Sequence, residues 1–432
     1  MKQERIDILT KVLKESGAAA WELTDKAETG WEFYLIGDKL DQHRVREVNH
    51  VLLRVYSQGP DGQLGNAEGE IAPTADEAEM AEAVRSLLDA SRYAMNPGWT
   101  LNRPSKQAPA KAEPCPEVEK VSADFLNAVV HLPQDETAYL NSSEIFVTRV
   151  TKRIMNSEGL DVTDTYPVSM AEIIVNARDQ AHEIELYRMF HSGACDAPGL
   201  QARLRKAMRY GQDKLIAQPT PPVGSMDLVL STEAAIEVYD WYLAHLNAMF
   251  KYRGYSDWEI GTPIAEGEGD KVTLRARTAL PNSSRNCRFD AEGAWTRDMV
   301  LMKANVPQAF FGARQFAQYL KLEDSFTPGN FEVEGGSAGA KALLEGDYLE
   351  VVEFSAFQID PVSGDLAGEI RLGYLHQGDQ VTIVSGGSVS GNMAELTGSI
   401  RFSRETSQYD HFLIPTVTRL RNVSVAGGSA EP

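Results

Sequence analysis

Apolar and polar positions along the first hundred residues predict helices that flank a sheet. Residues 3–17 carry apolar side chains three and four positions apart and end at a glycine, which predicts an amphipathic helix. Two runs rich in aromatic and β-branched residues, 31–36 and 51–56, predict strands on which this helix packs. Thr74 and Glu77 have the spacing of a capping box before an apolar stripe, so a second helix is expected there.

The middle of the chain has the pattern of a long β-meander between two helical segments. A helix is expected near 117–130, and strand-like sequence continues through about residue 191. Within it, the related phrases LNSSE at 140–144 and MNSEG at 155–159 predict turns. A helix at 197–217 then leads to a cluster of prolines, where we place the main domain boundary.

The last half of the chain predicts a second, β-rich domain. A short buried strand at 228–230 is followed by Ser231 as a helix N-cap and by one long helix at 232–250. Strands, glycines and turns dominate afterwards, with a helix near 310–320. The fold class is therefore α+β, with N-terminal helices on a β-sheet or meander and a β-rich C-terminal domain. The predicted parts are an N-terminal subdomain at 1–103, a linker at 104–116, a second N-terminal part at 117–222, the C-terminal domain at 223–428 and a tail at 429–432.

Composition excludes some classes of partner. The 432 residues include 42 Lys and Arg against 62 Asp and Glu, a formal net charge of −20. This charge repels phosphate backbones and no run of basic residues opposes it, so no nucleic-acid binding is expected. No segment approaches the about 18 uninterrupted apolar residues of a membrane helix, and no signal-peptide pattern opens the chain. With an odd number of scattered cysteines, these features predict a cytoplasmic protein without membrane contact.

Several phrases of the second half occur in an order that resembles one known family. They are YRGYS at 252–256, FDAEG at 289–293, TPGN at 327–330, IDPVSGD at 359–365, GYL at 373–375, VSGGSVSGNM at 384–393 and NVSVAG at 422–427. Together they resemble the TldD/PmbA family, also called peptidase U62 or the modulator of DNA gyrase family. The resemblance implies the family's two-domain fold. It also implies that Tyr252, Arg253, Gly254, Gly391 and Asn392 contribute to the family's cavity.

The same resemblance locates a metallopeptidase signature that this chain has lost. The TldD branch carries His-Glu-x-x-x-His on the helix after the domain-opening strand, which supplies two zinc ligands and a general base. Here the six positions read DWYLAH, so Asp240 replaces the first histidine, Trp241 replaces the glutamate and only His245 is kept. The family's third ligand, a cysteine near the final strands, is absent from 401–410, and the last cysteine is Cys287. The resemblance therefore implies the TldE/PmbA-like branch, with no catalytic residue, metal or cofactor of its own.

Two weaker metal candidates rest on the remaining histidines. Asp240 and His245 are both ligand types, but five residues place them roughly 140° apart on an ideal helix. A lone histidine on a helix of mixed polarity is typically a hydrogen-bonded structural residue. His182 and His191 lie in strand-like sequence, where their spacing does not bring two imidazoles together. The glycine cluster at 335–339 lacks the context of a phosphate-binding loop.

Three functions agree with the sequence. By resemblance, the chain is a non-catalytic subunit that pairs with a TldD-like subunit, which would hold the zinc, and encloses unfolded peptides; an exposed strand edge of the β-rich domain would bind the peptide. Alternatively, the altered pocket around Asp240, Tyr242 and His245 performs non-zinc chemistry. The third function is that of a homodimer that binds a peptide or small molecule.

Overall fold

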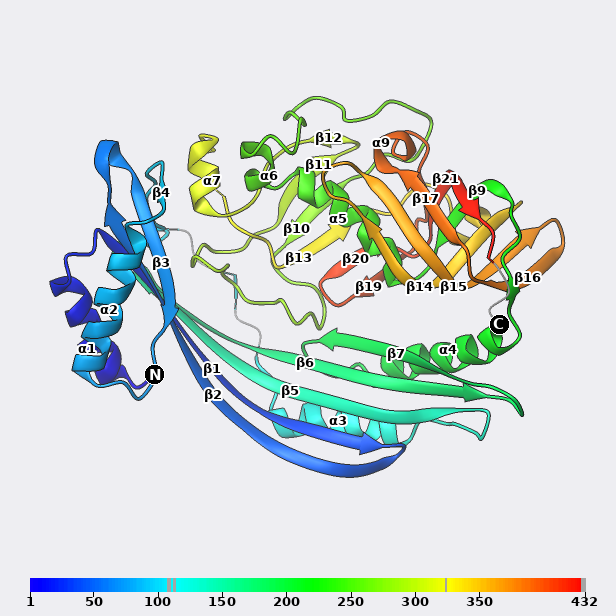
Figure 1. The fold of residues 1–432 in the computed structure, drawn as a ribbon, viewed down its shortest axis with the longest axis horizontal. Helices are drawn as coiled ribbons and strands as arrows, with labels where there is room; N and C mark the ends of the chain where they lie inside the picture. Colours follow the sequence, from blue (N-terminus) through cyan, green and yellow to red (C-terminus); the bar gives the residue numbers. More distant parts are fainter. Residues whose placement is uncertain (107–109, 112–113, 323–324, 429–432) are drawn as a thin grey trace.

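The computed structural model describes residues 1–106, 110–111, 114–322 and 325–428. The predicted tail at 429–432 and part of the predicted linker lie outside these ranges. Figure 1 shows a long arched sheet formed by the N-terminal region, with a β-rich C-terminal domain above its concave side. The fold is α+β with this arrangement of two parts, which confirms the predicted fold class.

The arched sheet is antiparallel and has the strand order β4-β3-β2-β1-β5-β6-β7 within the described residues. Its strands are β1 (Ala20–Ile36), β2 (Lys39–Gln58), β3 (Leu64–Glu70), β4 (Met95–Asn96), β5 (Ala138–Asn156), β6 (Asp161–Arg178) and β7 (Glu183–Ser192). The prediction of a turn at 140–144 is wrong, because these residues lie inside β5 and pair with β6, with a register shift between Leu140 and Ser142. The phrase at 155–159 does form the turn between β5 and β6. Pairing with strands on both sides outweighs the local turn propensity at 140–144.

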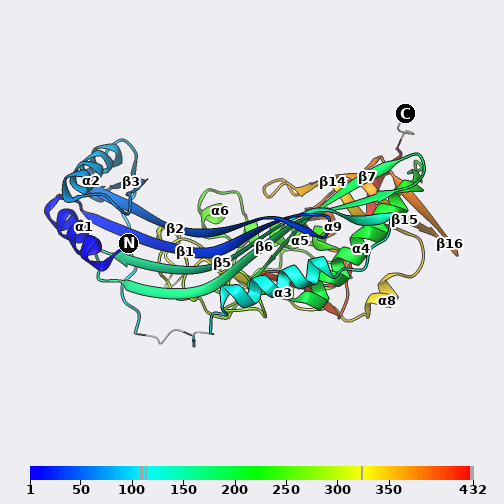
Figure 2. The same cartoon turned by 90° about the horizontal axis from the view of Figure 1, so that it is seen from below.

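The helices of this part are α1 (Gln3–Glu15), α2 (Glu77–Ser91), α3 (Val118–Val130) and α4 (Ala197–Leu215), with a 3-10 turn η1 (Pro60–Gly62). All four predicted helices exist, but the cap of α2 differs from the prediction. Asp76 accepts the N–H of Glu79, whose side chain accepts the N–H of Asp76, so the capping box lies two residues after the predicted one. Figure 2 shows α3 and α4 running along one face of the sheet.

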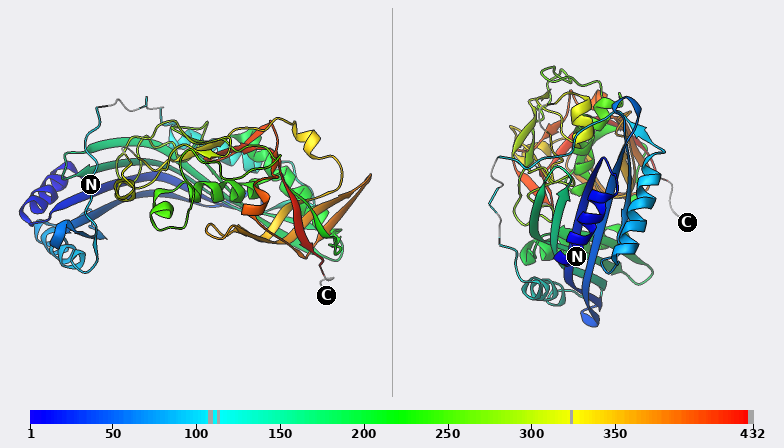
Figure 3. Two further views of the ribbon diagram at one scale, coloured as in Figure 1. Left: turned by 90° about the horizontal axis from the view of Figure 1, so that it is seen from above. Right: turned by 90° about the vertical axis from the view of Figure 1, so that its left-hand side faces the viewer.

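Alternation along the strands separates the two faces of the arch. Val147 and Ile173 are buried against α3 and α4. Thr148 and Lys152, an odd number of positions from Val147, point to the opposite face, where they line a cavity beside the C-terminal domain. The right-hand view of Figure 3 shows this domain on one side of the sheet and α3 on the other. The C-terminal domain therefore covers the face of the arch opposite to α3 and α4.

The C-terminal domain contains two sheets, ordered β12-β11-β10-β13-β20-β19 and β14-β9-β21-β17-β15-β16-β8 in the described residues. A further pairing between β14 and β15 closes part of the second path into a ring. The strands are β8 (Gln218–Pro219), β9 (Gly224–Leu230), β10 (Leu274–Arg277), β11 (Met299–Lys303), β12 (Val306–Pro307), β13 (Asn330–Val333), β14 (Tyr348–Ile359), β15 (Asp365–Gln377), β16 (Gln380–Ser385), β17 (Ser388–Asn392), β18 (Arg401–Phe402), β19 (Thr406–Tyr409), β20 (Phe412–Pro415) and β21 (Thr418–Ala426).

The helices of this domain are η2 (Glu233–Ala235), α5 (Ile236–His245), α6 (Ala248–Tyr252), α7 (Arg314–Tyr319), α8 (Ala340–Leu343) and α9 (Met393–Leu396). The single helix predicted at 232–250 is wrong, because η2, α5 and α6 are separate. Asn247 adopts an extended conformation, pairs with Phe311 and caps α6, which ends α5 at His245. Ser231 is not the N-cap: its hydroxyl donates to Glu350, and the side chain of Thr232 caps η2.

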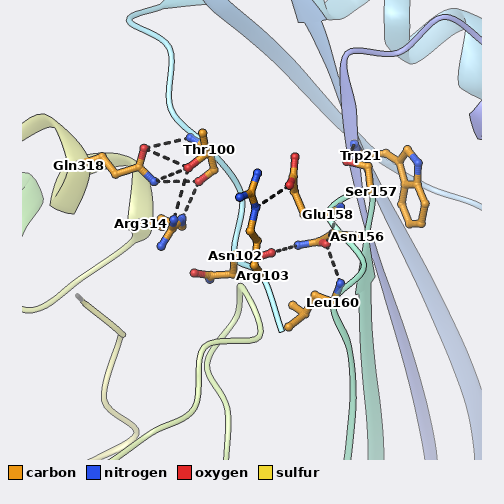
Figure 4. A network of polar contacts seen from close by, with 10 residues as sticks. All are labelled: Trp21, Thr100, Asn102, Arg103, Asn156, Ser157, Glu158, Leu160, Arg314 and Gln318. Carbon is orange, nitrogen blue, oxygen red and sulfur yellow. Dashed lines mark hydrogen bonds and ion pairs between the residues drawn. The ribbon is translucent and has the colours of Figure 1, made fainter. Parts of the chain in front are cut away.

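One extended segment ties the two parts together (Figure 4). The side chain of Asn156, the last residue of β5, donates to the carbonyl of Asn102 at 2.8 Å. The side chain of Asn102 in turn donates to the carbonyl of Glu292 at 3.0 Å. Two residues earlier, the carbonyl of Thr100 accepts from Arg314 at 2.6 Å and from Gln318 at 2.8 Å on α7. The segment therefore links the end of the arch to the C-terminal domain through its main chain.

None of the helices in the described ranges combines the length and apolarity needed to span a bilayer.

Candidate functional site

Helix α5 carries the positions of the lost zinc signature, and most of its side chains belong to the core of the C-terminal domain. Tyr239 and Tyr242 are completely buried. Their hydroxyls form hydrogen bonds with the side chains of Thr418, at 2.8 Å, and Thr397, at 3.1 Å. These bonds fix the rotation of α5 about its axis.

His245 ends α5 inside an aromatic cluster. Its ring stacks on Trp258 with centroids 4.6 Å apart and meets Trp241 edge to face at 4.8 Å. Neither ring nitrogen has a hydrogen-bond partner among the described residues, so the hydrogen bonds expected from the sequence are not found there. Burial lowers the pKa of His245, and the negative charge of Asp257 opposes this shift. The imidazole is therefore held in its neutral form.

Asp240 lies on another side of α5 and is exposed. Loss of hydration beside the helix and the negative charge of Glu237 raise the pKa of Asp240 to about 6, whereas His411 lowers it. Because the residue is exposed, solvent screens these effects in part. Asp240 and His245 thus lie in different environments, one facing solvent and one facing aromatic rings, and do not act on a common atom.

A cavity of about 540 Å³ lies beside the first turn of α5, between the two parts of the chain. Residues of β7, α4, η2, α5, β14 and β19 line it. Arg188 on β7 forms an ion pair with Glu353 on β14, which links its two walls. Burial raises the pKa of Glu237 and lowers that of Lys206, and neither has an ion-pair partner in the described residues. The cavity thus offers charged groups of both signs that form no ion pair in the described residues, since Arg203 and Glu233 line it as well.

Comparison with known proteins identifies the C-terminal domain. Residues 223–427 match the family model of the PmbA/TldA metallopeptidase C-terminal domain. These residues, nearly half of the chain, therefore form a C-terminal domain of the PmbA/TldA metallopeptidase type. No curated protein matches its sequence.

Solved structures show that the similarity of fold extends over nearly the whole chain. TldE from Thermococcus kodakarensis superposes with a TM-score of 0.77 at 16% identity, covering 98% of this chain and 100% of that one. A candidate modulator of DNA gyrase from Thermotoga maritima gives 0.78 at 16% identity, with coverage of 98% and 100%. Another from Bacteroides thetaiotaomicron gives 0.79 at 16% identity, with 99% of both chains covered. At this identity the superpositions show the fold alone.

The residues at the family's zinc positions do not fit a catalytic zinc. By the resemblance, Trp241 stands where the TldD branch has its general base, and its indole packs against Trp258 and Tyr242. Aromatic rings surround His245, and Asp240 faces another direction. In the described ranges, no group of three His, Cys, Asp or Glu side chains is arranged to hold a metal ion. We therefore derive no chemical step through a metal in this chain.

The other residues that the TldD/PmbA resemblance singled out lie at corners of the C-terminal domain. Tyr252 ends α6 and packs against Tyr319 with ring centroids 4.9 Å apart, and Gly254 follows with a positive φ of 74°. Arg253, between them, is the C-cap of α6. None of these residues lines the 540 Å³ cavity.

The Gly391 and Asn392 pair ends β17 near α5. The Asn392 side chain donates to the carbonyl of Ser363 and to the carboxylate of Asp365, both at 2.9 Å. The turn between these residues lies against the motif helix: a Cβ on Gly364 would come within 3.3 Å of the Trp241 indole nitrogen. The structure thus brings the degenerate signature and the Gly-Asn phrase together, although neither residue of the pair lines the 540 Å³ cavity. Their assignment to the family's cavity stays a prediction.

The weaker candidates for a metal site, His182 and His191, do not lie together in the structure. His182 lies in the exposed β6–β7 turn and His191 near the far end of β7. Gly335 and Gly336 pack against main-chain carbonyls, where an added Cβ would come within 2.2 Å and 2.1 Å. This part of the glycine cluster serves close packing.

Sequence reasoning missed the charged residues of the 540 Å³ cavity. Lys206 comes from α4, Glu237 from α5 and Glu353 from β14, which are far apart in the sequence. The sequence held one local indication of Glu237. Glu237 lies three positions before Asp240, so the two side chains lie on the same side of α5.

Proposed function

We propose that this chain is a non-catalytic, TldE/PmbA-like subunit of a cytoplasmic TldD/TldE-type metallopeptidase complex that acts on unfolded peptides. The observation that carries the proposal is the environment of α5. Trp241 stands in the core at the position of the general base, and aromatic rings enclose His245. The family's water-activating chemistry would then come from the zinc of a TldD-like partner.

Two strand edges beside α5 support a role in holding extended peptide. β7 ends the arched sheet and β19 ends the first sheet of the C-terminal domain, so each has an outer side that no strand of the described residues pairs with. Both line the 540 Å³ cavity, β7 through residues 187–190 and β19 through residues 407–409. Such edges bind a peptide through its main chain, independently of its sequence, and exclude folded proteins. We expected an edge from the β-rich domain, and here an edge of the arch lies opposite it.

Main-chain recognition is tested with modified peptides. We expect an unstructured peptide and its scrambled sequence to bind the complex equally, because strand addition uses backbone groups. The same peptide with alternate N-methylated amides loses those donors and should bind at least tenfold more weakly. Equal binding of the N-methylated peptide would exclude the edge strands as the binding element.

Formation of the complex is tested by analytical ultracentrifugation. The purified chain is run alone, with the TldD-like protein of the same genome, and with an unrelated protein of similar size and charge. The proposal predicts a one-to-one complex only with the TldD-like protein. A stable homodimer that does not exchange with it would instead favour the homodimeric binding protein.

A further inference from the structure

A second cavity, of about 670 Å³, lies between the concave face of the arch and the C-terminal domain. Two of the family-like phrases form its upper wall: FDAEG contributes residues 289–291, and TPGN contributes Thr327 and Gly329. The arch contributes both apolar and polar side chains. The apolar ones are Phe146, Val150, Val168 and Met170, and the polar or charged ones include Lys26, Glu28, Arg46, Thr148, Lys152 and His191. The proposed partner role assigns no task to this space.

The two acidic side chains of this cavity already have partners. Glu28 forms ion pairs with Lys26 and with Arg46, the latter at 3.0 Å, and these contacts lower its pKa against the opposing effect of burial. The carboxylate of Asp290 accepts three main-chain N–H groups, from Thr327 at 2.9 Å and from Glu292 and Ala294 at 2.8 and 3.0 Å. Burial lowers the pKa of Lys152, and the negative charge of Asp290 opposes this shift without forming an ion pair with it.

Two cations of the cavity have no carboxylate partner among the described residues. The ammonium of Lys152 donates to the main-chain carbonyl of Asp290 at 3.2 Å and lies 5.5 Å from the centre of the Phe289 ring. The guanidinium of Arg285 is exposed at the rim and forms no ion pair with any residue that the structure describes. In a chain with a net charge of −20, a cavity with two unpaired cations beside apolar walls is an unusual local environment.

The remaining ionisable groups add no negative charge at neutral pH. Burial raises the pKa of the Cys287 thiol, which lies beside Tyr166, and burial also raises the pKa of that phenol. Both groups are therefore neutral. His191 on β7 lines this cavity, and its neighbour Phe190 lines the 540 Å³ cavity.

We propose that the 670 Å³ cavity binds a carboxylate of an extended, apolar peptide, with Arg285 at the rim and Lys152 on the cavity wall as its cationic partners. The carboxylate is either the peptide's C-terminus or an acidic side chain. The peptide nature of the ligand rests on the proposed function, whereas the preference for an anion rests on the charges of this cavity alone. Charge-assisted hydrogen bonds from Arg and Lys are the strong contacts available to such a group.

Isothermal titration of the purified full-length chain, without a partner, tests the proposal. The probes are acetyl-Ala-Leu-Phe-Ala with a free C-terminal acid, the same peptide as an amide, and an amide in which glutamate replaces leucine. We expect the acid to bind at least tenfold more tightly than the apolar amide, and this preference to shrink with salt. Tight binding of the glutamate amide assigns the site to side-chain carboxylates as well, and weak binding restricts it to the C-terminus.

Three variants locate the binding site. Arg285→Gln and Lys152→Met should each weaken binding of the acid at least tenfold and leave the amide unchanged. Arg205→Gln removes the same charge from an exposed position of α4 outside the cavity and should change neither. Arg285 is exposed, so its variant keeps the test valid if Lys152→Met fails to fold. Equal affinity for acid and amide, or full affinity in Arg285→Gln, would overturn the proposal. Complex formation plays no part in this titration, so failure of the partner role is seen separately.

Discussion

Replacing His245 by leucine should make the chain less sensitive to acid. The imidazole is 6% exposed and has no hydrogen-bond partner in the described residues, so it is buried at a cost of about 1–3 kcal/mol. Leucine removes this cost and loses the ring contacts with Trp241 and Trp258, worth about 0.5–1.5 kcal/mol. At neutral pH the variant should therefore be more stable by roughly 1 kcal/mol.

The pH dependence follows from the lowered pKa of His245. Below the ordinary value of 6.5, the unfolded chain binds a proton that the folded chain does not. The wild-type protein should then lose about 1.4 kcal/mol per pH unit relative to His245→Leu, from pH 6.5 down to the lowered folded-state pKa. Above pH 6.5 both states are neutral and the difference is constant.

Urea unfolding at several pH values between 8 and 5 measures this difference. Because a chain with two parts need not unfold in one step, the two proteins are compared by the midpoint of the transition that reports the C-terminal domain. His182→Gln, at a side chain that is 75% exposed, should follow the wild type. Parallel loss of stability in wild type and His245→Leu would refute the neutral, buried histidine. Zinc that stabilises the wild type but not the variant would show that His245 is a ligand after all.

Three further predictions concern the junction of the arch and the C-terminal domain. Asp290→Asn should lower stability by about 1–3 kcal/mol, because its amide cannot accept all three N–H groups; a melting temperature equal to wild type would contradict this. Asn156→Ala should lower stability by a similar amount, about 1–3 kcal/mol, because the N–H groups of Glu158 and Leu160 lose their acceptor. Thermal unfolding measures this loss, with Arg205→Ala at an exposed position as the control. Burial raises the pKa of Glu292 from 4.5 to about 7, so its contribution to stability is lost as pH rises from 4.5 to about 7 and does not change above that. Glu292→Gln should abolish this loss, and an unchanged pH profile would refute it.

Periodic apolar spacing made α1, α2 and α4 predictable, but not the length of the arch. Residues 39–47 of β2 alternate little and are mostly exposed on both faces, so they give no strand-like hydrophobic signal. They remain extended because they pair with β1 along its whole length. Ladder hydrogen bonds, rather than burial, extend these strands beyond the short runs seen in the sequence.

The degenerate signature could be predicted because its six positions are consecutive in the sequence. The cavities could not be predicted, because their residues are far apart in the sequence. Trp241 and His245 could be placed from one aligned strand, and in the structure their rings pack against each other. The loss of the zinc site stays a prediction. By contrast, Lys152 and Arg285 line one cavity only because the arch packs against the C-terminal domain. A single sequence without the fold carries no signal for such a pair, because neither residue is unusual among its neighbours.

The central claim is that this chain does no peptidase chemistry without a partner, and one measurement tests it most directly. Zinc content and cleavage of an unfolded peptide are measured for the purified chain, for the TldD-like protein of the same genome, and for their mixture. We predict no stoichiometric zinc in this chain and cleavage that requires the TldD-like protein, with the highest rate in the mixture. Bound zinc at one equivalent, or cleavage by this chain alone, would contradict the account and return attention to Asp240 and His245.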